Sequence, residues 1–121
     1  MRYMLLIYAN EEAPELSETA REHCYVESTK LANELASTGQ FLQCAPLHPT
    51  SSATSVRVRD GKRTVTDGPF AETKEQLGGY FLIEASDLDE AISIADRIPG
   101  ARWGTVEIRP VVELPRATAA L

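Results

Sequence analysis

Cysteine and histidine are scarce in this sequence of 121 residues, which contains two of each. The chain has no Cys-x-x-Cys pair, no His-Glu-x-x-His motif and no glycine-rich loop with phosphate-binding spacing. No serine stands in a nucleophile-elbow context. These scattered residues do not form a recognisable metal motif, so we expect neither a bound metal nor a cofactor. An isolated cysteine pair without an export signal is typical of two thiols, and we predict that Cys24 and Cys44 are unpaired.

The sequence also lacks a long apolar run and an excess of basic residues. No run approaches the roughly 20 residues that span a bilayer. The formal net charge of -6 argues against a nucleic-acid partner, since such proteins usually carry a basic patch. The apolar run at residues 3–8 is too short for a signal-peptide core. We therefore expect a cytoplasmic protein with one modest hydrophobic core and no nucleic-acid or membrane partner.

The most informative stretch is T-D-G-P-F-A-E-T-K-E-Q-L-G-G-Y, at residues 66–80. The D-G-P triplet at residues 67–69 indicates a tight turn, because glycine accepts positive φ and a residue before proline avoids the helical region. Phe70 follows this turn, and we expect its ring to attach the loop to the core. The glycine pair at residues 78–79 would let a backbone or a ligand come close. A loop so specified, leading into an apolar strand, is where we place a candidate site.

The run D-G-P-F-A-E-T-K-E-Q-L-G-G-Y-F-L-I-E, at residues 67–84, resembles the signature of the DGPF-type, YCII-related protein family. Residues 1–8, 52–61 and 106–110 also match the family pattern, so the resemblance covers residues 1–115. It implies a ferredoxin-like α+β fold that pairs into a dimeric α+β barrel. It implies no established reaction, but His–Asp chemistry is suspected for some relatives. Members are often encoded near alternative sigma factors, which implies a functional link to such a factor.

The hydrophobic pattern by itself predicts the order β-α-β, hairpin, β-α-β. The expected elements are strands at residues 3–8, 41–47, 79–85 and 106–112, helices at residues 16–38 and 86–98, and a hairpin at residues 56–66. Ser86 would cap the second helix, and Asp60-Gly61 would turn the hairpin, which has one cationic face. This predicts one α+β domain at residues 1–115, with a ferredoxin-like βαββαβ antiparallel sheet, two helices on one face and an inserted hairpin. Residues 116–121 are expected to fray.

Two helices can cover only one face of such a sheet, yet the strands at residues 3–8 and 80–83 are apolar on both sides. The second face must pack against something, and a second copy of the chain is the simplest partner. We therefore expect a homodimer joined through the sheet faces. The two-sided apolar strands favour this dimer independently of the family resemblance.

His23 lies on the flank of the first helix's apolar stripe, where its imidazole could act as an acid–base near neutral pH. Relatives carry a histidine at this place on the first helix; the alternative is a solvated ring paired with Glu27. Asp67 could be the catalytic carboxylate partner, or could form an Asx turn with its own backbone. The relatives' suspected aspartate has no clear counterpart, because residues 99–103 contain no Asp. His48, in a turn, is a second candidate histidine.

Four further residues are candidates for substrate binding: Arg57, Glu72, Lys74 and Tyr80. Arg57 could bind an anionic substrate or belong to a solvated strand face. Glu72 and Lys74 could order the loop as an ion pair, with little gain in stability. Tyr80 could offer a hydroxyl to a small-molecule ligand or pack as a core aromatic.

The sequence is compatible with two functions. One is a cofactor-independent small-molecule enzyme with His23 as acid–base, in a partly apolar cleft bounded by Asp67, Arg57 and Tyr80. The other is a non-catalytic binding or regulatory module that acts through protein partners. An apolar cavity with His23 pointing inward would favour the enzyme, and a filled core with His23 in solvent would favour the module.

Overall fold

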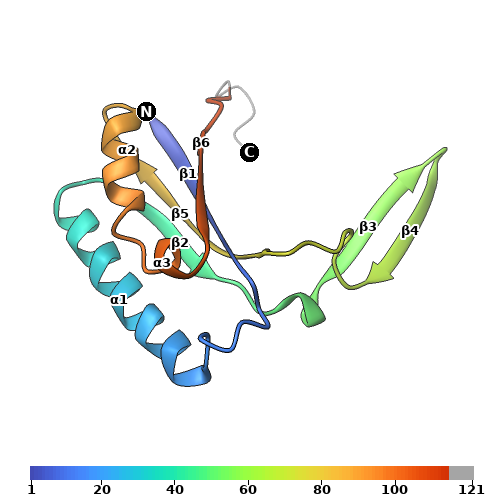
Figure 1. The fold of residues 1–121 in the computed structure, drawn as a ribbon. Helices are drawn as coiled ribbons and strands as arrows, with labels where there is room; N and C mark the ends of the chain where they lie inside the picture. The colour runs from blue at the N-terminus through green and yellow to red at the C-terminus, as the bar shows by residue number, and fades with distance from the viewer. Residues whose placement is uncertain (115–121) are drawn as a thin grey trace.

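The computed structural model describes residues 1–114 and shows an antiparallel sheet covered by helices on one face (Figure 1). In chain order the elements are β1 (Arg2–Ala9), α1 (Glu18–Ser37), β2 (Phe41–Pro46), the 3-10 helix η1 (Thr50–Ser52), β3 (Thr54–Arg59), β4 (Lys62–Asp67), β5 (Gln76–Glu84), α2 (Leu88–Ala95), α3 (Gly100–Trp103) and β6 (Thr105–Pro110). The four-stranded sheet has the order β2-β5-β1-β6, and β3 and β4 form a separate hairpin. This arrangement confirms the predicted ferredoxin-like α+β fold with an inserted hairpin. The fraying predicted for residues 116–121 lies outside the described residues.

The core lies between the sheet and the helices. β1 is a central strand, and its Tyr3 and Leu5 are buried opposite Ile83 and Phe81 of β5. The helices and their flanking residues complete the core with Leu31, Ala32, Leu35, Ala85, Ala91, Ile94, Ala95 and Ile98. Burying one large apolar side chain stabilises a fold by roughly 1.5–3 kcal/mol. These residues therefore hold the helices on one face of the sheet.

The ends of α1 follow from local sequence signals. Ser17 accepts a hydrogen bond of 3.1 Å from the amide of Ala20 at the start of the helix. At the other end Gly39 takes a φ of 77°, and the amide of Gln40 donates to the carbonyl of Leu35 at 2.9 Å. This is a Schellman-type ending, which satisfies a carbonyl of the last turn.

The start of α2 corrects the predicted cap at Ser86. Asp87 is the N-cap instead, and its carboxylate accepts a hydrogen bond of 2.9 Å from the amide of Glu90. Glu90 reaches back and accepts from the amide of Ser86 at 2.9 Å. A carboxylate is favoured at the N-cap because it accepts hydrogen bonds strongly and lies at the positive end of the helix dipole. α2 ends at Ala95, earlier than expected, and the short α3 forms where the sequence predicted an irregular connection.

The hairpin β3-β4 projects from the domain on the side of the sheet opposite to the helices (Figure 1). It turns at Asp60 and Gly61, which both adopt positive φ, as the predicted two-residue turn requires. Its valines Val56, Val58 and Val65 are 59%, 59% and 56% exposed. An isolated two-stranded hairpin is only marginally stable in water. Because its valines are exposed, this hairpin presents apolar surface that the described part of the chain leaves uncovered.

The connection from the hairpin to β5 differs from expectation in two respects. Phe70 is 77% exposed, so the prediction that it attaches the loop to the core is wrong. The connection bridges the projecting hairpin and the sheet (Figure 1), and none of the core residues lies in residues 68–75. β5 begins at Gln76 rather than at residue 79, so Gly78 and Gly79 are strand residues. The connection is ordered partly by Gln76, which donates to the carbonyl of Thr73 at 2.6 Å.

The sheet face opposite the helices is apolar at its centre. On β1, Met4 and Leu6 alternate with the buried residues, and they pair with Leu82 and Tyr80 of β5. All four are partly exposed. In the chain that the structure describes, no helix covers this face (Figure 1). Within residues 1–114, no helix is long and apolar enough to cross a membrane.

Candidate functional site

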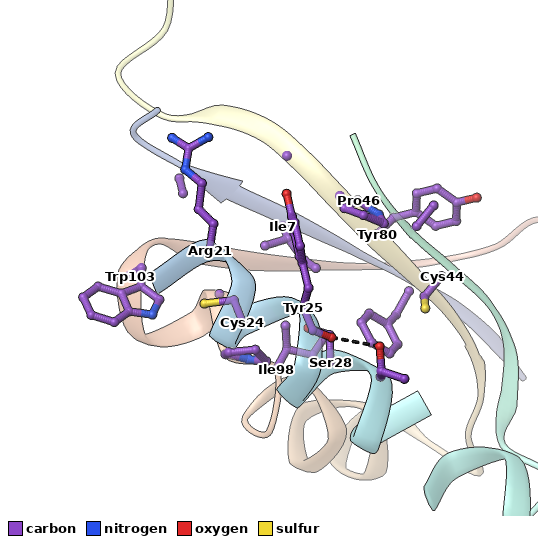
Figure 2. A pocket seen from close by; sticks show the side chains of 18 of the residues that line it. Ile7, Arg21, Cys24, Tyr25, Ser28, Cys44, Pro46, Tyr80, Ile98 and Trp103 are labelled. Atoms are coloured by element: carbon purple, nitrogen blue, oxygen red, sulfur yellow. Dashed lines mark hydrogen bonds between the residues drawn. The ribbon is translucent and has the colours of Figure 1, made fainter. Parts of the chain in front are cut away.

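A cavity of about 240 Å³ lies between the N-terminal half of α1 and the sheet (Figure 2). One wall is formed by Arg21, Cys24, Tyr25, Ser28 and Thr29 of α1, with Leu16 just before the helix. The opposite wall is formed by Ile7 and Ala9 of β1, Cys44, Ala45 and Pro46 of β2, and Gly78, Gly79, Tyr80 and Phe81 of β5. Ile98, Pro99, Gly100 and Trp103 close one side. The lining is predominantly apolar, as is usual for small-molecule sites.

The cavity exists because large side chains give way to small ones along two facing elements. On the buried face of β5, the alternate residues Ile83 and Phe81 fill the core, but the next position is Gly79. On α1 the buried Leu31 is followed, one turn toward the N-terminus, by the half-buried Ser28. Neither Ser28 nor Gly79 can fill the space between helix and sheet, so a hollow remains in an otherwise close-packed layer.

Gly79 also lies unusually close to the neighbouring strand β2. A Cβ atom at this position would lie 3.0 Å from the carbonyl oxygen of Ala45 and 3.3 Å from the Cα of Pro46. β2 therefore approaches β5 so closely at this point that a larger residue would be tight against its backbone. The sequence expectation that the glycine pair admits a neighbouring backbone is confirmed for Gly79.

Arg21 and Tyr25 form a partition between this cavity and a smaller one of about 110 Å³. They are one helical turn apart, so both project from the same face of α1 (Figure 2). The Nε of Arg21 donates to the carbonyl of Leu16 at 3.3 Å, and its Nη2 donates to the carbonyl of Glu11 at 2.9 Å. These bonds fix the guanidinium at the junction of the two cavities.

Both thiols of the chain face the larger cavity, and both are free. Burial raises the pKa of the Cys24 thiol, and the nearby Glu27 carboxylate raises it further. Burial likewise raises the pKa of the Cys44 thiol. A raised pKa keeps a thiol protonated, and a protonated thiol is a poor nucleophile. The two cysteines therefore act as small apolar groups of the wall.

The structure does not bring together the four residues predicted to bound a cleft. His23 is exposed on α1 and does not line the cavity, although its neighbour Cys24 does. Arg57 lies on β3 and Asp67 at the end of β4, both exposed on the hairpin. Tyr80 borders the cavity from β5, but its ring points away from α1 (Figure 2). In a single chain these residues occupy three separate regions.

The remaining candidates lie in connections. Glu72 and Lys74 are exposed between β4 and β5, and within residues 1–114 no ion pair joins them. His48 is exposed between β2 and η1. Across the described part of the chain, no group of three or more His, Cys, Asp or Glu side chains is placed to hold a metal ion.

Sequence reasoning missed the residues that shape the cavity: Arg21, Tyr25, Ser28 and Trp103. One signal was present, because the predicted apolar stripe of α1 runs from leucines to Ser28 and Cys24 toward the N-terminus. Small residues on a buried stripe indicate a cavity only when the opposing strand also has a small residue. That pairing with Gly79 depends on the fold.

The structure is that of a small α+β protein with an apolar cavity between α1 and the sheet. The model of the YCII-related domain matches residues 1–115, so the chain belongs to the YCII-related family. An uncharacterized protein of Rhizobium meliloti (strain 1021) is 35% identical over 114 residues, which is 92% of each chain. These similarities confirm membership of the YCII-related family, which the central motif predicted.

Proposed function

We propose that this YCII-related protein binds a small, mainly apolar molecule in the cavity between α1 and the sheet. The observation that carries the proposal is the hollow in the core where Gly79 faces the small residues of α1. An unfilled volume of about 240 Å³ costs packing contacts that larger residues would supply. A function that needs the space accounts for that cost.

The chemistry of the lining supports binding more than acid–base catalysis. Its ionisable side chains are Arg21, two thiols whose pKa values are raised by burial, and two tyrosines. Because burial raises the pKa of both thiols, they remain protonated near neutral pH and are poor general bases. The proposed role is therefore to bind a ligand.

Acid–base catalysis by His23 with Asp67 stays a prediction. Within one chain the two residues lie on α1 and on the projecting hairpin, so a shared site would need a second copy or a movement of the hairpin. His23→Ala tests it: loss of an activity found later, at an unchanged melting temperature, would support the catalytic role. Retained activity would remove His23 from the mechanism.

A second copy of the chain is the proposed partner at the open sheet face. Leu6 and Leu82 lie in the apolar centre of that face, and Phe70 and the hairpin valines add exposed apolar surface. A two-fold related copy presents the same patch, so one apolar centre would pack on the other. The hairpin projects on that side and would lie against the partner (Figure 1). The DGPF-type subgroup, the cytoplasmic location and the link to an alternative sigma factor stay predictions.

A thermal-shift screen of small apolar and amphipathic metabolites tests the binding proposal. A ligand that binds only the folded chain raises its melting temperature with concentration. A ligand in this cavity should also slow the alkylation of Cys24 by N-ethylmaleimide, because the thiol forms part of the wall. A compound that raises the melting temperature without protecting Cys24 binds elsewhere and contradicts the proposal.

A further inference from the structure

We propose that the cavity selects molecules with a carboxylate group, and that Arg21 binds this carboxylate. The inference rests on the proposed function, since it names the chemical class that the same cavity accepts. The ligand is then a monocarboxylate with a flat apolar or aromatic body. Arg21 binds its charged end, and the apolar wall encloses the rest.

Arg21 has donors to spare at the edge of the cavity. Its guanidinium carries five N–H groups, and the two hydrogen bonds that the structure shows, to the carbonyls of Leu16 and Glu11, employ Nε and Nη2. Within residues 1–114 the other N–H groups have no hydrogen-bond acceptor. Arg21 lines both cavities, so a ligand in either of them lies near this guanidinium.

The charge of Arg21 also lacks a counter-ion in the described part of the chain. The arginines that form ion pairs in residues 1–114 are Arg2, Arg97 and Arg102, each with a glutamate. The Glu11 carboxylate is occupied elsewhere: it accepts from the amide of Thr50 at 2.8 Å and from its hydroxyl at 2.7 Å. A half-buried cation without a carboxylate partner gains more from an anionic ligand than a solvated arginine would.

The geometry of the group favours a carboxylate in particular. A guanidinium presents parallel donors that match the two oxygens of a carboxylate. Arg21 is the single charged side chain among the described residues that line the larger cavity. A ligand with an uncharged apolar body and one carboxylate therefore fits this cavity. The body would occupy the interior, and the carboxylate would lie at the Arg21 end.

Calorimetric titration with cinnamate and with cinnamamide tests the inference. The two probes share a flat aromatic body and differ in the charge of the end group. The intact protein should bind cinnamate about tenfold more tightly or better, the gain expected from hydrogen bonds to a charged group. Arg21→Gln should abolish this preference, and Arg21→Lys should retain part of it through charge alone. Arg63→Gln removes the same charge from the exposed hairpin and should leave the preference unchanged.

The outcomes separate this inference from the proposed function. Binding of cinnamamide by Arg21→Gln shows that its cavity is intact, which guards against misreading an unfolded variant. Equal affinity of the intact protein for both probes would overturn carboxylate selection and leave the cavity proposal standing. A preference that survives in Arg21→Gln would overturn the role of Arg21. Absence of binding by either probe, and by every metabolite of the screen, would overturn both proposals.

Discussion

Replacing Ser28 with leucine should fill the cavity and make the protein more stable. Ser28 lies on the wall formed by α1, facing the space that Gly79 leaves open. Leucine adds three carbon atoms there, each buried CH₂ contributing about 0.8 kcal/mol. The gain is reduced because the cavity is partly open to solvent, and tight fitting has its own cost. We expect Ser28→Leu to raise the free energy of unfolding by about 1–2 kcal/mol.

Thermal and denaturant unfolding measure this change, and a matched variant separates packing from helix propensity. For a domain of this size, 1 kcal/mol corresponds to a shift of roughly 3–6 °C in melting temperature. Ser93→Leu makes the same substitution on the exposed face of α2, where it changes helix propensity and removes one exposed hydrogen bond of 3.1 Å from the Ser93 hydroxyl to the carbonyl of Asp89. Ser28→Leu should exceed this control in stability and should lose affinity for cinnamamide. Destabilisation relative to Ser93→Leu, or unchanged binding, would refute the cavity argument.

Three further predictions concern the surface and the thiols. Leu6→Glu places a carboxylate at the centre of the open sheet face, where burial of an unpaired charge would oppose dimerisation. Light scattering should show a dimer mass for the unaltered chain and a monomer mass for this variant. A monomer mass for the unaltered chain would refute the dimer. Cys24 should react more slowly with iodoacetamide at neutral pH than a free cysteine, because its raised pKa lowers the thiolate fraction. An equal rate would contradict this. The hydrogen bond from Arg102 lowers the pKa of Glu27 in the folded protein. The pair therefore stabilises the fold fully at pH values above the ordinary glutamate pKa. This stabilisation is lost as the pH falls through the lowered pKa of Glu27 in the folded state. Arg102→Gln should remove this small acid-dependent difference in unfolding titrations.

The fold could be predicted because its signals are local. Gly39 and the Asp60-Gly61 pair adopt positive φ where the helix stop and the hairpin turn require it. The apolar pattern of residues 3–8 predicted a strand apolar on both faces, and the structure places this strand between β5 and β6 in the sheet. Each of these signals involves only residues close together in the chain.

The site could be predicted less well because it depends on contacts between distant residues. Ser28 and Gly79 form a cavity only when α1 packs over β5, and nothing within either segment reveals that meeting. His23 was chosen for its chemistry, but consecutive residues lie about 100° apart around a helix, so His23 is exposed while Cys24 lines the cavity. Phe70 was assigned to the core for its size, although its position between hairpin and sheet leaves it exposed.

The most direct test of the central claim is a titration of the isotopically labelled protein with cinnamamide, followed by amide chemical shifts. The binding proposal predicts that the largest changes fall on Cys24, Ser28 and Gly79, with the indole N–H of Trp103 also affected. The amides of the hairpin, such as that of Val58, should remain unchanged. Changes concentrated on the open sheet face or on the hairpin, with none at Ser28 and Gly79, would contradict the claim that this cavity is the binding site.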